Sequence, residues 1–329
     1  MSAVAPLEVR NLEKRFPIGG ALHHAHVHAV DDVSFVLQPG RITALVGESG
    51  SGKTTVARLL ARLYDPTAGT VLFEGEDASG LRRRHEILNY RSQVQMIFQD
   101  PFGSLNPVKT VRHHLERPLR IHRIVPSGEI RRRVHELLEI VGLVPPEEVA
   151  AKYPHELSGG QRQRVAIARV LAVEPKVILA DEPTSMLDVS IRIGILNLML
   201  KLKEEHDIAF LYVTHDLASA RYIADDLLVM YAGQVVESGP AERVLAEPLH
   251  PYTRLLIDAA PDPAALAGKR IEPRKGLAAA AVDPPDACRF LARCPLAVAA
   301  CSASTPALVE ARPGQAARCH VTAPAPSIT

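Results

Sequence analysis

The sequence has no cysteine in its first 287 residues, no long apolar run and almost no net charge. A formal charge of +1 does not mark the chain as a nucleic-acid binder. No run approaches the roughly 18 to 20 apolar residues that a membrane-spanning helix needs. The opening MSAVAPLEVR lacks the basic-then-apolar layout of a secretory signal, so we expect a cytosolic protein. Stable disulfides are disfavoured in that compartment.

The composition and the order of apolar segments indicate a globular α/β protein. Hydrophobic residues make up 47% of the chain and charged residues 23%, and 329 residues suffice for one large domain and a smaller one. Between 157 and 240, short apolar strands alternate with helical segments, which predicts a mostly parallel sheet covered by helices. Beyond about 250, alanine and proline increase, which indicates a linker to a small terminal module.

The stretch GESGSGKT (47–54) lies between a predicted buried strand and a predicted helix. It fits the pattern G-x-x-x-x-G-K-[ST], whose glycines let backbone N–H groups approach phosphate oxygens. Lys53 would bridge the β- and γ-phosphates, and the Thr54 hydroxyl would ligate Mg²⁺. The alternative is a glycine-rich turn that binds nothing, but the strand–turn–helix context favours a nucleotide site. The predicted contacts are Gly47, Glu48, Ser49, Gly50, Ser51, Gly52, Lys53, Thr54 and Thr55.

Two adjacent carboxylates end the apolar stretch VILADE (177–182). Asp181 is predicted to hold the Mg²⁺ ion, and Glu182 to polarise the attacking water as general base. Burying two carboxylates at a strand end has a desolvation cost, which makes a purely structural role a poor explanation. The alternative for Glu182 is an ordinary surface glutamate.

The stretch LSGGQRQR (157–164) resembles the signature of the ABC (ATP-binding cassette) ATPases, and other landmarks of that family occur in the family order. Gln99 matches the Q-loop, Asp188 the D-loop and His215 the switch histidine, and Phe16 stands where the family stacks an aromatic ring on adenine. The resemblance implies that Glu182, His215 and Gln99 are catalytic. It also implies that Mg²⁺ is held by Thr54, Gln99 and Asp181, and that further ATP contacts come from Ser158, Gly159, Gly160, Gln161 and Asp188.

The glycine pair after Ser158 is predicted to begin a helix, whose N-terminus attracts anions. In ABC proteins the signature of one cassette closes on the ATP that another cassette holds. The resemblance therefore implies a head-to-tail pair. It also implies a P-loop NTPase fold with a RecA-like parallel sheet core, an N-terminal antiparallel β subdomain and a helical subdomain at about 100–160. We expect the cassette over 1–245 and a C-terminal extension with the cysteines over 246–329.

Further segments resemble the ATPase subunits of bacterial dipeptide/oligopeptide importers, namely GESGSGKTT, FQDPFGSLNP, YPHELSGGQRQR, ADEPTSMLDVSI and LAEPLHPYTRLL. QDPFGSLNP is closer to the subunit called OppF or DppF than to OppD or DppD. One departure is Met186, which replaces the alanine common in the D-loop.

The resemblance implies that ATP hydrolysis powers peptide import. The implied partners are an OppD/DppD-like second cassette in a heterodimer, two membrane permease subunits and, indirectly, a peptide-binding protein. The implied location is the cytoplasmic face of the plasma membrane. The alternatives are an ABC ATPase that works without a permease and a degenerate cassette that only binds ATP. The intact Glu182, His215 and LSGGQ argue against the degenerate cassette.

All four cysteines fall in the spacing C-x5-C-x6-C-x17-C, at Cys288, Cys294, Cys301 and Cys319. Structural zinc sites usually contain close C-x2–4-C pairs, which this spacing lacks. Four thiolates suit a [4Fe–4S] cluster, and Arg289, Arg293 and Arg318 stand beside three of them, where they could balance its negative charge. The sequence therefore predicts a structural iron–sulfur cluster, with Zn²⁺ or free thiols as alternatives.

Two other patterns have less specific explanations. HHAHVH (23–28) could bind a transition metal, but a solvated loop is the expected explanation. The arginine runs at 82–84 and 131–133 are interleaved with glutamates, which favours solvated helix faces. We expect no nucleic-acid partner.

Overall fold

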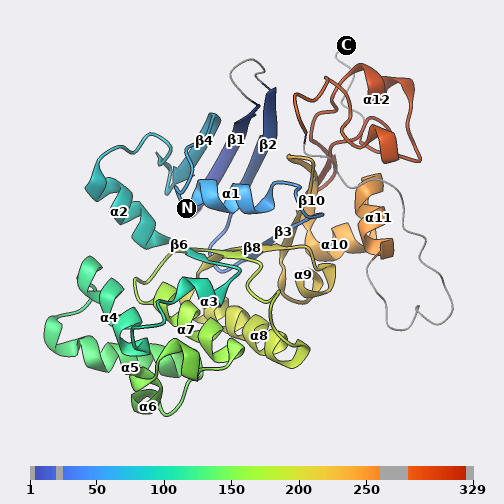
Figure 1. Ribbon diagram of the computed structural model, residues 1–329. Helices are drawn as coiled ribbons and strands as arrows, with labels where there is room; N and C mark the ends of the chain where they lie inside the picture. Colours follow the sequence, from blue (N-terminus) through green and yellow to red (C-terminus); the bar gives the residue numbers. More distant parts are fainter. Residues whose placement is uncertain (1–3, 20–24, 260–280, 324–329) are drawn as a thin grey trace.

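The computed structural model describes residues 4–19, 25–259 and 281–323 and contains two β-sheets (Figure 1). The smaller sheet has four antiparallel strands in the order β2-β1-β4-β5. Its strands are β1 (Leu7–Ile18), β2 (Ala25–Leu37), β4 (Ala68–Phe73) and β5 (Glu76–Asp77). This sheet is the predicted N-terminal antiparallel subdomain.

The larger sheet has eight strands in the order β11-β12-β10-β9-β3-β8-β7-β6. The five strands from β9 to β6 run parallel, and β10, β12 and β11 are antiparallel additions. Strands β3, β7 and β8 are buried along their whole length, as parallel strands covered on both faces must be. The bounds are β3 (Ile42–Val46), β6 (Val94–Ile97), β7 (Val177–Asp181), β8 (Ala209–Thr214), β9 (Asp226–Tyr231), β10 (Gln234–Pro240), β11 (Val309–Arg312) and β12 (Gln315–Ala317). The prediction of an α/β fold with a parallel core is confirmed.

Helix α1 (Lys53–Leu60) lies between the two sheets (Figure 1). Its buried face shares one core with the antiparallel sheet and with one face of the parallel strands. Leu45 of β3 faces this core, whereas its neighbours Ala44 and Val46 face the core on the other side of the sheet. This alternation along a strand fixes the position of α1, and therefore of the loop that precedes it.

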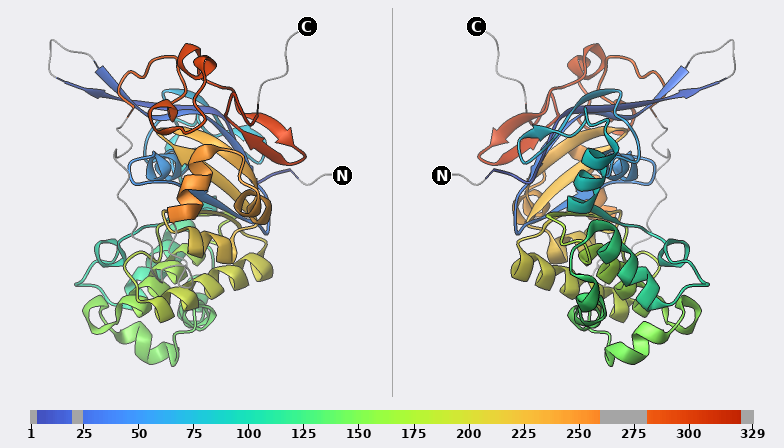
Figure 2. Two further views of the ribbon diagram at one scale, coloured as in Figure 1. Left: turned by 90° about the vertical axis from the view of Figure 1, so that its right-hand side faces the viewer. Right: turned by 90° about the vertical axis from the view of Figure 1, so that its left-hand side faces the viewer.

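The helical subdomain packs at one end of the parallel sheet (Figures 1 and 2). In α5 (Ile130–Ile140), the buried residues Ile130, Val134, Leu137 and Leu138 recur at the helical period and form a single apolar face. The other helices in and beside the subdomain are α2 (Arg84–Gln93), α3 (Pro101–Ser104), α4 (Val111–His122), α6 (Pro146–Ala151), α7 (Gly159–Leu171) and α8 (Val189–His206). None of the helices in the described part of the chain has the length and hydropathy that a bilayer crossing requires.

The second arginine run lies on the helix α5, as predicted. Arg132 pairs with Glu129 and Glu136, and Arg133 pairs with Glu136 and Glu174. These pairs explain the run as a charged helix face.

The histidine-rich segment differs from the expected loop. His23 lies outside the described residues, as does His24, but His26 and His28 belong to strand β2, which pairs with β1. The His28 ring is 17% exposed and lies near the carboxylates of Asp31 and Asp283. Residues 25–28 form a partly buried strand rather than a loop, so the solvated-loop prediction is wrong for the second half of the segment.

The chain continues through α9 (Leu217–Ile223), α10 (Ala241–Ala246) and α11 (Pro251–Ala259), and the described part of the chain resumes at residue 281. We call residues 281–323 the C-terminal module; it contains α12 (Ala299–Ala303). Its strand β12 pairs with β10, and Val282 forms a bridge with Val27 of β2. The module therefore extends the sheet of the cassette, at the end of the molecule away from the helical subdomain (Figures 1 and 2).

Candidate active site

The glycine-rich loop joins the end of β3 to the start of α1, as the sequence predicts. A Cβ atom at Gly47 would lie 2.1 Å from the carbonyl oxygen of Met230, and one at Gly52 would lie 2.1 Å from that of Ala29. Gly52 also has a φ of +106°, which side chains rarely tolerate. Neighbouring backbone thus requires glycine at both positions and fixes the shape of the loop.

Lys53 lies at the centre of this loop. Its Nζ atom donates hydrogen bonds to the carbonyl oxygens of Gly47 (2.7 Å) and Glu48 (2.8 Å). Burial lowers the pKa of Lys53, while the nearby charges of Glu182, Asp181 and Glu48 oppose that shift. An ammonium with three donors in this position can exchange carbonyl partners for phosphate oxygens.

Asp181 at the end of β7 meets the first turn of α1. The Thr54 hydroxyl donates a hydrogen bond to Asp181 Oδ1 at 3.0 Å. Burial raises the pKa of Asp181, and the bond from Thr54 opposes the rise. A hydroxyl and a carboxylate side by side are the hard oxygen donors that Mg²⁺ prefers, so these residues fit the ion.

Glu182 lies between the two other residues predicted to be catalytic. The Nε2 atom of Gln99 donates to Glu182 Oε2 at 2.9 Å, and His215 Nδ1 lies 2.9 Å from Glu182 Oε1. The three residues follow the carboxyl ends of β6, β7 and β8, which are adjacent in the sheet. Neighbouring parallel strands therefore bring them together. Glu182 also has a φ of +46°, a strained conformation of the kind that functional sites hold.

A pocket of about 480 Å³ opens above these residues. Several of its lining residues were predicted from the sequence, namely Ser49, Gly50, Gly52, Lys53, Thr54, Thr55, Gln99, Glu182 and His215. The sequence did not predict the other wall, which is formed by Val27, His28, Ala29, Ala232, Gly233 and Ala281. The histidine-rich segment was the one available signal for part of this wall. Ala281 comes from the C-terminal module and has no local sequence signal.

Phe16 is not among the residues that line this pocket. Its ring meets the ring of Tyr64 edge to face at 5.6 Å between centroids, and Lys14 Nζ lies 5.1 Å from its centre. Its stacking on adenine stays a prediction.

The signature residues begin helix α7 as predicted. The Ser158 hydroxyl accepts a hydrogen bond from the Gln161 N–H, and the Gln161 side chain accepts one from the Ser158 N–H, which forms a capping box. Among the described residues that line the pocket, none comes from Ser158–Gln161, and Asp188 is likewise absent. Ser158 and Asp188 are exposed. The signature therefore remains available to a second molecule.

The four cysteines are free thiols, and Cys301 and Cys319 are buried. Burial raises the pKa values of the Cys288 and Cys294 thiols, and charges on the other cysteines would raise both further. Within residues 4–19, 25–259 and 281–323, no group of three or more His, Cys, Asp or Glu side chains is arranged to hold a metal ion. The described structure therefore gives no support to the predicted iron–sulfur cluster or to the zinc alternative. It gives none to a metal site at HHAHVH either.

The arginines beside the cysteines have other partners. Arg289 pairs with Asp31 and Arg318 with Asp32, both in β2, and Arg293 pairs with Glu48 of the glycine-rich loop. The expectation that these arginines balance the charge of a cluster is wrong. They join the C-terminal module to the rest of the protein.

Comparison with known proteins identifies the family. Residues 30–185 match the family model described as ABC transporter, and residues 236–301 match the one described as oligopeptide/dipeptide transporter, C-terminal region. A probable peptide ABC transporter ATP-binding protein of Sinorhizobium fredii is 45% identical over 324 residues, which cover 98% of this chain and 91% of that protein. The chain belongs to the ABC transporter ATP-binding proteins.

Other relatives of this ABC ATPase are similar over most of its length. The oligopeptide transport ATP-binding protein AppF of Bacillus subtilis is 43% identical over 96% of this chain and 97% of its own. OppF of the same organism is 48% identical over 78% of this chain and 83% of its own. Among solved structures, CbiO1 of Clostridium perfringens superposes with a TM-score of 0.64 at 30% identity, covering 74% of this chain and 91% of its own. A dimeric ATP-binding cassette bound to ADP and Pi superposes with a TM-score of 0.62 at 31% identity, covering 71% of this chain and 98% of its own.

Proposed function

We propose that this ABC ATPase hydrolyses ATP to power the import of di- or oligopeptides through a membrane permease. The observation that carries the hydrolytic part is Glu182, held between Gln99 and His215 at the edge of the pocket beneath the phosphate-binding loop. The peptide transport ATP-binding proteins among its relatives support the choice of cargo.

In the proposed mechanism, Lys53 exchanges its loop carbonyl partners for the β- and γ-phosphates. Thr54 and Asp181 would hold Mg²⁺, with Gln99 as a further ligand, and the ion would neutralise phosphate charge. Glu182 accepts a proton from the attacking water at its carboxylate, which Gln99 and His215 keep oriented. His215 is about half exposed and can approach the γ-phosphate from the open side of the pocket.

We propose that the permease docks at a second cavity, of about 840 Å³. It lies between β6 and helix α4, and Phe98, Lys109, His113 and Arg117 are among the residues that line it. Phe98 is 40% exposed and immediately precedes Gln99 in the chain. A permease segment in this cavity would therefore contact Phe98, the neighbour of the residue that orients Glu182. This proximity supports coupling between transport and hydrolysis.

The proposed assembly is a head-to-tail pair of cassettes with two permease subunits. The exposed Ser158 at the start of the signature and the dimeric cassette among the solved relatives support the pairing. We take an OppD/DppD-like protein as the second cassette, which makes a heterodimer, and a peptide-binding protein as an indirect partner. The ATPase would lie on the cytoplasmic face of the plasma membrane, held there by the permeases. The proposed boundary between cassette (1–245) and extension (246–329) falls at the end of α10.

The test combines a pull-down from detergent-solubilised membranes with uptake of labelled dipeptides and tripeptides. We expect two polytopic membrane proteins to copurify with the tagged ATPase. We also expect cells without it to lose peptide uptake while free amino acid uptake continues. Expression of the wild type should restore uptake, and Glu182→Gln should not. Copurification with soluble partners alone would favour an ABC ATPase that works without a permease.

We keep the iron–sulfur cluster, with Zn²⁺ as the alternative, as a separate proposal. Its support is the donor chemistry: four thiols from one short segment, close enough for their charges to interact. In the described arrangement they do not form a metal-binding group, so binding would require their rearrangement and deprotonation. Iron and acid-labile sulfide analysis of anaerobically purified protein tests it. About one zinc and no iron would select the alternative, and absence of both metals would leave four free thiols.

A further inference from the structure

The C-terminal module touches the phosphate-binding loop through one ion pair. The Arg293 guanidinium donates from Nη1 to Glu48 Oε2 and from Nη2 to Glu48 Oε1, both at 2.9 Å, across 245 positions of sequence. Such a paired geometry is the strongest form of arginine–carboxylate contact. Arg293 is 16% exposed and Glu48 27%, so the pair is partly shielded from water.

Glu48 is held through its side chain, its N–H and its carbonyl oxygen. Besides the bonds from Arg293 to the side chain, its N–H donates to the Tyr252 hydroxyl at 2.9 Å, and its carbonyl oxygen accepts from Lys53 Nζ at 2.8 Å and from the Ser51 N–H at 3.2 Å. Tyr252 is itself buried against Tyr231 and Phe290, and Phe290 belongs to the C-terminal module. The side chain and the N–H of Glu48 are therefore both held by residues that follow the cassette.

The Glu48 carboxylate is a negative charge in a loop that, under the proposed function on which this inference rests, must receive a triphosphate. Together with Glu182 and Asp181, the Glu48 carboxylate favours the charged form of Lys53 and opposes the lowering of its pKa by burial. Without a partner, this carboxylate would repel the phosphates and compete with them for Lys53. The guanidinium of Arg293 neutralises the carboxylate and holds it in one direction.

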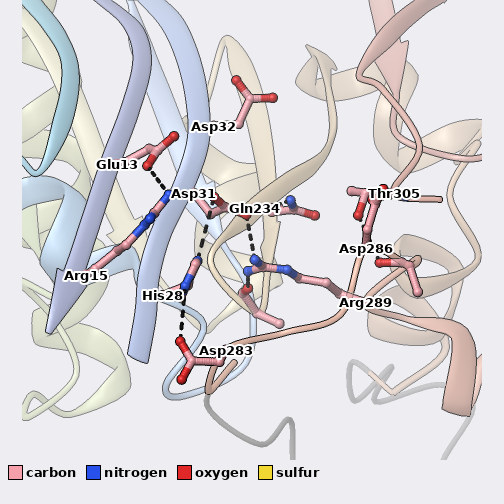
Figure 3. A network of polar contacts seen from close by, with 12 residues as sticks. Glu13, Arg15, His28, Asp31, Asp32, Gln234, Asp283, Asp286, Arg289 and Thr305 are labelled. Atoms are coloured by element: carbon pink, nitrogen blue, oxygen red, sulfur yellow. Dashed lines mark hydrogen bonds and ion pairs between the residues drawn. The ribbon is translucent and has the colours of Figure 1, made fainter. Parts of the chain in front are cut away.

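The module is attached to the cassette by other contacts, which lie beside β2 (Figure 3). The Arg289 guanidinium pairs with Asp31 at 2.5 Å. Within the cassette, Gln234 of β10 donates to the same carboxylate at 3.0 Å and helps to fix it. The His28 N–H donates to the Ala281 carbonyl oxygen at 2.8 Å, and the His28 ring lies 3.8 Å from Asp283. Loss of Arg293 alone therefore leaves the module in place.

We propose that Arg293 of the C-terminal module is a positioning residue for ATP, which acts by neutralising and fixing Glu48 in the phosphate-binding loop. The module then takes part in nucleotide binding, although it holds none of the sequence motifs of the cassette. Because Arg293 does not touch the reacting atoms, its loss should weaken ATP binding more than it slows the chemical step.

The test measures MgATP affinity by calorimetric titration of the full-length chain, and KM and kcat for ATP in its transporting complex. We expect Arg293→Ala to weaken ATP binding and raise KM about tenfold, with kcat within twofold of the wild type. Arg293→Lys keeps the charge but not the paired geometry and should recover part of the affinity. The control is Arg312→Ala, which removes an ion pair of the same module with Glu247, distant from the loop, and should leave affinity unchanged.

A double-mutant cycle separates this role from a general loss of structure. In a Glu48→Gln background there is no carboxylate to neutralise, so Arg293→Ala should change affinity by less than twofold relative to Glu48→Gln alone. Thermal unfolding confirms that each variant is folded at the assay temperature. The proposal is overturned if Arg293→Ala binds MgATP as tightly as the wild type. It is also overturned if Arg293→Ala reduces MgATP affinity by the same factor in the wild-type and Glu48→Gln backgrounds.

Discussion

His215 Nδ1 lies 2.9 Å from Glu182 Oε1, although 33 positions of sequence separate the two residues. They follow β8 and β7, adjacent parallel strands, so the sheet fixes their separation. Gln99, which follows β6 on the other side of β7, occupies the second carboxylate oxygen. The carboxylate is thus fixed in orientation, while each oxygen keeps a lone pair that can accept a proton, which leads to the first prediction.

We predict that Glu182→Gln binds MgATP but loses turnover by about a hundredfold or more, because an amide cannot accept the proton of the attacking water. The variant should also accumulate as the closed pair in the presence of ATP. Phosphate release and size-exclusion chromatography measure the two effects. Glu204→Gln, an exposed position on α8, is the matched control. Normal turnover in Glu182→Gln would remove Glu182 as the general base.

We predict that Lys53→Ala loses nucleotide affinity. The ammonium is the buried cation of the loop, and its charge-assisted hydrogen bonds are worth about 1.5 to 3 kcal/mol, or about a tenfold to hundredfold change in affinity. Calorimetric titration with MgATP measures the change, and Lys201→Ala on the exposed face of α8 serves as the control. Unchanged binding would contradict the assignment of the phosphate-binding loop.

We predict that Ser158→Ala separates binding from hydrolysis. The Ser158 hydroxyl caps α7, so its loss should cost about 1 kcal/mol of folding stability. ATP binding to the isolated chain should be unchanged, because Ser158 does not line that chain's own pocket. Hydrolysis by the paired cassettes should fall, since the signature would contact the ATP of the partner. Equal hydrolysis by wild-type and variant pairs would argue against the head-to-tail arrangement.

The sequence predicted those parts of the fold and site that short motifs encode. The loop at 47–54, the buried strand ending at Asp181 and the capped helix after Ser158 each follow from local patterns, because adjacent residues must supply the glycines, the apolar strand and the cap. The order of the strands in the sheet brings these segments together, and the alternation of strands and helices along the sequence constrains that order.

The sequence could not show contacts that depend on tertiary packing. The pairing of β12 with β10 places the C-terminal module beside β2, and no residue near Arg293 encodes that Glu48 will be its partner. The arginines near the cysteines were therefore assigned to the wrong partners. His28 was missed for the same reason, because Asp283 approaches it from the far end of the chain.

His250 is 2% exposed and is the first residue of the stretch HPYT (250–253). Its Nδ1 atom accepts a hydrogen bond from the Tyr252 N–H, and its ring packs on Phe290, so the neutral ring is held in place. Burial lowers the pKa of His250 to about 4, from 6.5 for an exposed histidine. Below about pH 6.5 the unfolded chain therefore takes up a proton that the folded chain refuses, and stability falls as the pH falls toward 4.

Between pH 7 and pH 5, this one residue should cost the wild type about 2 kcal/mol of unfolding free energy. His250→Asn keeps an acceptor for the Tyr252 N–H but cannot take up a proton. We therefore expect the variant to be less stable than the wild type at pH 7, since it loses the ring contact with Phe290, yet to lose less stability on acidification. Urea unfolding at a series of pH values measures how the unfolding free energy of each protein depends on pH. His206→Asn, on the exposed end of α8, is the control. Parallel slopes for wild type and His250→Asn would show that His250 does not govern the acid sensitivity.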